Sequence, residues 1–241
     1  MITKEDLIRL YVESDFKSEQ VAEELGYSIP TVLKYLHQYG IKIKGIRHYN
    51  VHKGIGYSDE QYQFFDGLIG SDGSLTKQGN KNAKISCAFK YEEFATYIKD
   101  KLNLKNVHKK THFSDRYKAG FCIQYGVMSS NNVLFSKERE RWYNNGAKLI
   151  PDDFRFSPTS MNIFYLSDGY ITKKGKVIYL CTNAFEKTNI EQVLIKNLNY
   201  INIDCWVTKM NEICIPRRSV GDFLSYIGPC PVECYKYKWL V

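Results

Sequence analysis

One nine-residue stretch occurs twice in the chain, and this repetition constrains the fold more than any other feature. The first copy, residues 71–79, reads Ser-Asp-Gly-Ser-Leu-Thr-Lys-Gln-Gly, and the second, residues 167–175, reads Ser-Asp-Gly-Tyr-Ile-Thr-Lys-Lys-Gly. Each copy follows an apolar run that is typical of a helix. A duplicated unit of helix, Asp-Gly turn and strand predicts two similar half-domains that bring Asp72 and Asp168 together.

The pattern around the two copies predicts the same order of elements in each half of residues 58–241. Stretches of alternating apolar and polar residues, which predict strands, lie at 74–78, 84–90, 108–113, 120–125, 170–174, 177–182, 205–210 and 212–216. The first repeat, residues 58–148, and the second, residues 149–241, both give helix, two strands, helix, two strands, helix. This order predicts an α+β fold, a pseudo-twofold αββαββα duplication with antiparallel sheets, rather than a doubly wound fold.

The helix before the first Asp-Gly has a clear start and an unusual face. Ser58 and Gln61 form a capping box, in which each side chain can bond the other residue's backbone. Gly67 and Ser71 are four residues apart and share a face with little side-chain bulk. We therefore expect the backbone of the second motif helix to come very close to this face, with Ser167 at the contact.

Residues 1–45 predict a small all-α unit that precedes a basic linker at residues 46–57. Gly26 can end a helix in the left-handed conformation, and Ile29, Val32 and Leu36 form the expected buried stripe of the next helix. Helix, glycine turn, helix is the order of a helix-turn-helix, which places its last helix in the major groove of DNA. The residues expected to contact DNA there are Ser28, Thr31, Lys34 and His37. The alternative is a helical hairpin used for packing or protein contact.

Composition favours a nucleic-acid partner and an intracellular location. The formal net charge of +8 over 241 residues favours a polyanion. The seven cysteines are scattered and show no paired spacing of a structural zinc site, which predicts a reducing compartment such as the cytoplasm or an organelle matrix. We find no signal peptide and no apolar run long enough to cross a bilayer, so we expect no membrane partner.

The two repeated aspartates predict a metal site. Each is expected at the C-terminal end of a helix, where the carbonyl dipoles disfavour another negative charge. Two carboxylates held close together repel each other unless a cation lies between them. Mg²⁺ binds through carboxylate and phosphate oxygens, and two such ions can activate water and stabilise the leaving oxygen of a phosphodiester. A single Asp-Gly after a helix is usually only a turn, but the duplication favours the metal site.

These motifs resemble those of the LAGLIDADG homing endonucleases in their single-chain, two-repeat form. Residues 65–73, Phe-Asp-Gly-Leu-Ile-Gly-Ser-Asp-Gly, line up with the nine-residue motif of that family, and residues 160–169 are similar to its divergent second motif. Further similarities lie at 180–185, 213–219 and 235–239. The resemblance covers residues 58–241 and implies a site-specific, Mg²⁺-dependent double-strand DNA endonuclease that acts in intron homing. The helix-turn-helix is an addition to it.

The resemblance also implies which residues form the active site. The last acid of each motif binds the metals, which here means Asp72 and Asp168, and the carbonyl groups of the preceding Ser71 and Ser167 assist. In the family a lysine near each metal site stabilises charge or polarises water. The matching lysines here are Lys148 and Lys238, with Lys236 as an alternative to Lys238.

The strand faces opposite the core are expected to lie along DNA. By alternation the candidates are Ser74, Thr76, Gln78, Lys84 and Lys90 in the first repeat and Tyr170, Thr172, Lys174, Lys209, Arg217 and Arg218 in the second. The expected partner is double-stranded DNA with a long asymmetric target site, bound by a monomer. Two alternatives on the same fold are a non-cleaving DNA-binding transcriptional regulator, as in proteins similar to WhiA, and an RNA-binding intron maturase. Neither needs both acids, so the presence of Asp72 and Asp168 favours the nuclease.

Overall fold

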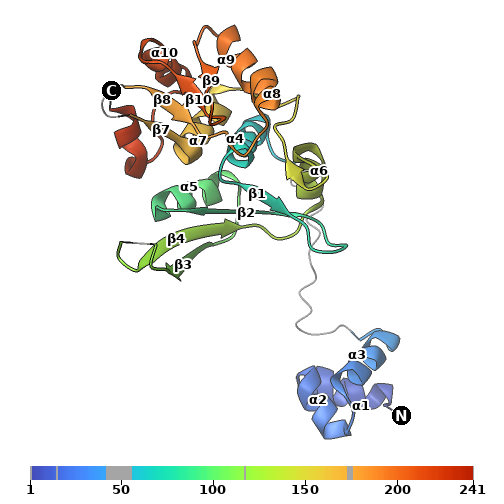
Figure 1. The fold of residues 1–241 in the computed structure, drawn as a ribbon. Coiled ribbons are helices and arrows are strands. Elements are labelled where there is room, and N and C mark those ends of the chain that lie inside the picture. Colours follow the sequence, from blue (N-terminus) through green and yellow to red (C-terminus); the bar gives the residue numbers. More distant parts are fainter. Residues whose placement is uncertain (1, 15, 42–55, 117, 173–175, 241) are drawn as a thin grey trace. The chain divides into compact units, whose positions relative to one another are not determined.

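The structure is a computed structural model in which the chain divides into two compact units, Met1–Asn50 and Val51–Val241. Figure 1 shows the fold, in which the described residues are 2–14, 16–41, 56–116, 118–172 and 176–240. Most of the predicted basic linker at 46–57 lies outside these residues. Within the described part of the chain, every helix is too short or too polar to cross a membrane.

The first unit consists of short helices around a small apolar core. Its elements are α1 (Lys4–Leu7), the π-helical η1 (Ile8–Glu13), α2 (Ser18–Leu25) and α3 (Ile29–Gln38). Gly26 ends α2 with a φ of 66°, as predicted. Val32 and Leu36 are fully buried, but the prediction for Ile29 is wrong, because this side chain is 39% exposed. Ile29 is the first residue of α3, and a helical side chain packs over the turn that precedes it, which is missing there.

The second unit contains two repeats with the predicted order of elements. The first repeat consists of α4 (Asp59–Gly70), β1 (Ser74–Thr76), β2 (Lys84–Phe89), α5 (Glu92–Lys101), β3 (Val107–Phe113), β4 (Phe121–Met128) and α6 (Val133–Trp142). The second consists of α7 (Pro158–Asp168), β7 (Gly169–Ile171), β8 (Ile178–Leu180), a helix formed by α8 (Lys187–Ile190), η2 (Glu191–Ile195) and α9 (Lys196–Tyr200), then β9 (Trp206–Val207), β10 (Ile213–Ile215) and α10 (Arg217–Ile227). A two-stranded hairpin, β5 (Tyr143–Asn144) with β6 (Ala147–Lys148), precedes α7, and the 3-10 helix η3 (Glu233–Trp239) follows α10.

The two sheets have equivalent topology. Their strand orders are β1-β2-β4-β3 and β7-β8-β10-β9, and every pair of neighbouring strands is antiparallel. The predicted α+β duplication is therefore confirmed. The sheets differ in length, because β3 and β4 have 7 and 8 residues whereas β9 and β10 have 2 and 3.

Several predicted strands are too long. The stretch at 74–78 ends as a strand at Thr76, so Gln78 lies in the following loop. The stretch at 205–210 ends at Val207, because the backbone turns sharply there and the N–H of Thr208 donates to the carbonyl of Glu212 at 2.8 Å. Alternation continues through such a turn in the sequence, which is why the pattern overextends the strand.

The motif helices α4 and α7 lie side by side at the centre of the second unit (Figure 1), and their backbones come very close. A β-carbon at Gly67 would overlap the backbone carbonyl of Ser160, and one at Gly70 would lie 2.8 Å from the ring of Phe164. The predicted close contact at Gly67 is thus present, but its partner is Ser160 rather than Ser167. Ile163, five residues before Asp168 as Gly67 is before Asp72, is too large for an equally close contact, so the contact falls on the small Ser160.

Candidate active site

The two repeated aspartates end the two central helices. Asp168 is the last residue of α7, and Asp72 follows the C-cap of α4, Ser71. Burial raises the pKa of Asp72 to about 7, and the negative charge of Asp168 adds to this shift. Burial also raises the pKa of Asp168. Asp72 is accessible to solvent, but neighbouring atoms crowd the carboxylate on its other sides, and this crowding weakens its hydration. The helix pair therefore places both carboxylates in one electrostatic cluster.

Both predicted lysines reach this cluster. The Lys148 ammonium, at the end of β6, donates to the carbonyls of Ser71 at 3.1 Å and Gly73 at 3.0 Å, on either side of Asp72. Burial lowers the pKa of Lys148 to about 8, and the charges of Asp168 and Asp72 oppose this shift. Lys148 uses two of its three N–H groups on these carbonyls.

Lys238 has the equivalent place beside the second aspartate. Its ammonium, on η3, donates to the carbonyls of Tyr165 at 3.1 Å, Leu166 at 2.7 Å and Gly169 at 2.6 Å. Burial lowers its pKa to about 8 as well, against the charges of Asp72 and Asp168. All three N–H groups of Lys238 are thus engaged at the end of α7, whereas the alternative, Lys236, forms an ion pair with Glu233 at 2.6 Å. The geometry favours Lys238 over Lys236, and we call Lys148 and Lys238 the site lysines.

The donor groups near the aspartates fit a hard divalent cation that keeps open positions. The described residues contain no group of three or more His, Cys, Asp or Glu side chains that could hold a metal. Two carboxylates are nevertheless the usual protein contribution to Mg²⁺, which takes its other ligands from water and phosphate. The Oγ of Ser167 is buried without a hydrogen-bond partner beside Asp168, and the Ser71 carbonyl already accepts a bond from Lys148.

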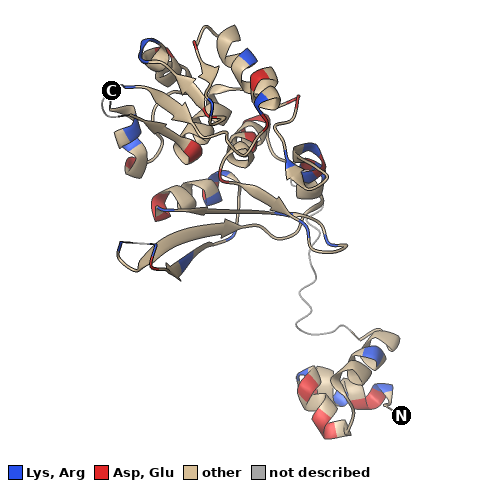
Figure 2. Cartoon of the chain, in the orientation of Figure 1, with Lys and Arg blue, Asp and Glu red and all other residues tan. Residues whose placement is uncertain are grey.

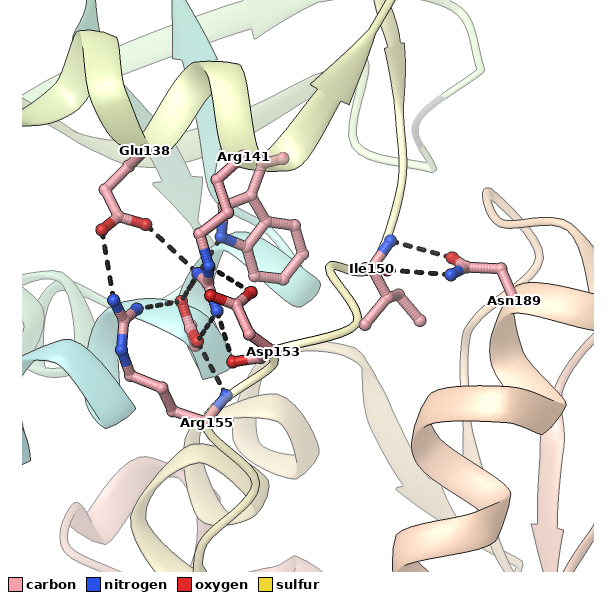
Figure 3. Close-up of polar contacts among 8 residues, drawn as sticks. Glu138, Arg141, Ile150, Asp153, Arg155 and Asn189 are labelled. Atoms are coloured by element: carbon pink, nitrogen blue, oxygen red, sulfur yellow. Dashed lines mark hydrogen bonds and ion pairs between the residues drawn. The ribbon is translucent and has the colours of Figure 1, made fainter.

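A buried carboxylate that the sequence interpretation missed lies inside the first motif. Asp66, on α4, is fully buried and binds the Arg141 guanidinium at 2.7 and 2.9 Å. Arg155 donates to Asp66 from its backbone N–H at 2.9 Å and from its side chain at 3.0 Å. Figure 3 shows this network, in which Glu138 binds both arginines and Asp153 binds Arg141. It fastens the connector between the repeats to α4 and α6.

The outer face of the first sheet carries polar and basic side chains. Cross-strand register places Thr76 opposite Lys84, and Lys110 opposite Gln124. The predicted Ser74, Thr76 and Lys84 lie on this face, and Lys90 follows β2 on the same side by alternation. Four further members were not nominated from the sequence, although their strands were predicted, and they are His108, Lys110, His112 and Gln124.

The outer face of the second sheet is aromatic instead. Tyr170 and Tyr179 lie opposite each other with stacked rings 5.2 Å apart, and Cys214 and the 48% exposed Trp206 continue the row. Among the predicted contacts of this repeat, Tyr170 lies on the strand face and Thr172 just beyond it. Lys174 lies outside the described residues. The remaining three are not on this face: Lys209 lies in the β9–β10 turn, Arg217 and Arg218 begin α10, and Arg218 binds Asp204 at 2.8 Å.

In the first unit, the predicted DNA contacts lie on α3 or at its cap. Lys34 and His37 are exposed, whereas the hydroxyl groups of Ser28 and Thr31 bond each other at 2.8 Å. Figure 2 shows acidic residues on α1 and α2, while α3 carries none. Among the helices described in this unit, α3 is thus the one whose charge suits a polyanion.

The second unit, with two repeats packed through their motif helices and one acid at each helix end, has the arrangement of a known family. A model of the LAGLIDADG DNA endonuclease family matches residues 62–219, so the chain belongs to this family. The structure of the homing endonuclease I-WcaI bound to its DNA recognition sequence has the same fold, with a TM-score of 0.70 and 21% identity over 82% of this chain and 92% of that one.

One curated relative matches over nearly the whole length. The chain is 24% identical over 246 residues to the uncharacterized protein MJ1098 of Methanocaldococcus jannaschii. The aligned region covers 95% of this chain and 96% of the relative. This match includes the helical first unit as well as the family domain.

Proposed function

We propose that the protein is a site-specific double-strand DNA endonuclease that hydrolyses phosphodiester bonds with divalent metal ions, Mg²⁺ by preference. The observation that carries the proposal is the joining of one carboxylate and one lysine from each repeat in a single cluster at the ends of α4 and α7. Membership of the LAGLIDADG DNA endonuclease family supports it. Because both repeats belong to one chain, a monomer supplies both half-sites.

The two half-sites suit a duplex because each repeat can act on one strand. Bound Mg²⁺ would supply an activated water and stabilise the leaving oxygen, with Asp72 and Asp168 as its protein ligands and the Ser71 and Ser167 carbonyls as candidates to assist. Lys148 has one N–H beyond those engaged by carbonyls, which can reach a phosphate oxygen or the attacking water. Lys238 acts through its charge, because its three donors are engaged.

The outer sheet faces are the proposed DNA interface. On the first sheet, amide and ammonium groups such as Gln124 and Lys84 suit base edges in the major groove and phosphates. On the second, Tyr170 and Trp206 suit apolar contacts with thymine methyl groups and sugars. We further propose that residues 1–45 are a helix-turn-helix unit that binds DNA beside the main site.

Removal of either aspartate tests the chemistry. Asp72→Asn or Asp168→Asn keeps the shape of the side chain but removes the charge that binds the metal, so cleavage should be lost while DNA binding remains. The measurement needs a target, which sequencing of the ends cut from a randomised DNA library with Mg²⁺ would identify. Glu92→Ala, which removes an exposed acid elsewhere, is the matched control. Unchanged cutting by either aspartate variant would refute the proposed centre, and binding without any cutting by the natural protein would favour a regulator.

Deletion of residues 1–45 tests the role of the first unit. We expect weaker DNA affinity and a shallower dependence on salt, because fewer phosphates are contacted, with an unchanged cleavage rate at saturating protein. Equilibrium binding across a series of salt concentrations measures both effects. An unchanged affinity would assign the unit another role.

A further inference from the structure

Each site lysine lies on a backbone segment that a side chain of the other repeat holds. Lys148 is the last residue of β6, and Ile150 lies two residues further on, in the connector that follows this strand. The Asn189 side chain, on α8 of the second repeat, accepts from the Ile150 N–H at 2.8 Å and donates to the Ile150 carbonyl at 2.8 Å. Figure 3 shows this two-point contact, which fixes the connector as a neighbouring strand would.

Lys238 is held by the first repeat in the same manner. The Glu93 carboxylate, on α5, accepts from the backbone N–H groups of Glu233 at 2.7 Å and Cys234 at 2.9 Å, where η3 begins. These donors have no partner within η3, and a carboxylate satisfies them well. The two hydrogen bonds also hold the pKa of Glu93 below its usual range.

Aromatic contacts connect α5 with the part of η3 that bears the lysine. The Tyr235 ring packs edge-on against Phe94 at 5.1 Å and Tyr91 at 5.2 Å. Residues three apart share a side of a 3-10 helix, so Tyr235 and Lys238 face the same way. The Lys238 ammonium lies 4.5 Å from the centre of the Tyr235 ring. A shift of η3 on α5 would therefore move Lys238.

The two holding residues occupy equivalent positions in the duplication. Glu93 lies in the first turn of α5, which follows β2, and Asn189 lies in the first turn of α8, which follows β8. A fully buried residue comes directly after each, Phe94 in one repeat and Ile190 in the other. Counted from this buried residue, the two side chains have the same place in their helices, and each contacts the segment that carries the site lysine of the opposite repeat.

We propose that Glu93 and Asn189 are positioning residues of the active site, and that each holds the segment bearing the site lysine of the other repeat. The inference rests on the proposed function for its effect on cleavage, but not for its effect on the lysines themselves. It makes each half-site dependent on both repeats. Loss of Glu93 disturbs the half-site of Asp168, and loss of Asn189 disturbs that of Asp72.

Strand-resolved cleavage distinguishes this positioning from a general loss of stability. The full chain acts on a duplex selected from the randomised library, with each strand labelled separately, under single turnover. Glu93→Ala should slow the cut of one strand by about 10- to 100-fold and Asn189→Ala that of the other, since small misplacements of catalytic groups cost this much. Glu93→Gln, which keeps an acceptor, should slow the cut less. Glu92→Ala and Thr188→Ala, in the same helical turns, are the matched controls.

A chemical measurement tests the hold without cleavage. Acetic anhydride labels accessible amines, and mass spectrometry locates the label. Labelling of Lys238 should rise severalfold in Glu93→Ala and that of Lys148 in Asn189→Ala, with the exposed Lys34 of the first unit as internal reference. Equal changes at both lysines, no change at either, or slowing of the same strand by both variants would overturn the inference. If the natural protein cuts neither strand, the proposed function fails, and the labelling alone decides whether the segments are held in this way.

Discussion

Alanine in place of Gly67 tests how closely the two motif helices must approach. The added β-carbon would overlap the Ser160 carbonyl, which belongs to the backbone and cannot rotate away. Overpacking costs about 1–3 kcal/mol, and contact with backbone places this case at the upper end, about 3 kcal/mol. Alanine also stabilises a helix relative to glycine by about 1 kcal/mol. The expected net loss in the free energy of unfolding is therefore about 2 kcal/mol.

Gly221 provides the matched control, because it lies within α10 and an added β-carbon there meets no atom within 4 Å. Gly221→Ala should therefore stabilise the protein by about 1 kcal/mol, from helix propensity alone. The same chemical change should thus have opposite signs at the two sites.

Thermal and urea unfolding of both variants measure the difference. For a domain of this size we expect the Tm of Gly67→Ala to fall by about 4–8 °C and that of Gly221→Ala to rise by about 2–4 °C. Cleavage by Gly67→Ala at saturating DNA should also slow, because separation of the helices moves Asp72 from Asp168. Equal stability of the two variants would refute the close backbone contact.

Two further perturbations test the charges around the centre. Asp66→Asn leaves Arg141 and Arg155 without their buried partner and should cost about 3–5 kcal/mol in urea unfolding, whereas a cost near zero would contradict the network. The Mg²⁺ affinity measured by calorimetry should rise about tenfold from pH 6 to pH 8, because the Asp72 pKa of about 7 means that a proton must leave before the metal binds. Asp72→Asn should bind Mg²⁺ more weakly and lose most of this pH dependence, and a flat profile in the natural protein would contradict the raised pKa.

Much of the fold could be predicted from the sequence because local signals agreed with the repeat. The capping box of Ser58 and Gln61 forms as expected, with bonds of 3.1 and 3.2 Å, and both repeats follow the predicted order of helices and strands. Strand ends were less predictable, since alternation at Gln78 and Lys209 continues past the backbone turns. The roles assigned to Asp72, Asp168 and the site lysines stay predictions.

Contacts between distant segments could not be predicted, because no local pattern encodes them. Asp66 lies on a helix that is buried almost all round, where an acidic residue gives no sign of its partner, and Arg155 is far along the chain. In the sequence, Glu93 has no feature that distinguishes it from other acidic residues in the first turn of a helix, because its partner Glu233 lies far along the chain. Repetition could have helped, since comparing α5 with α8 in register pairs Glu93 with Asn189.

The unequal sheets have a consequence for orientation. Hydrogen-bonding side chains cover the longer sheet, and a short aromatic row covers the other. On the proposed function, a duplex bound in the opposite orientation would place each half of its target site against the sheet that suits the other half. The protein would then sit on its target in one direction only, so that Asp72 always meets the same strand. The two aspartates are equivalent in the duplication, but the two unequal sheets would assign each of them to one particular DNA strand.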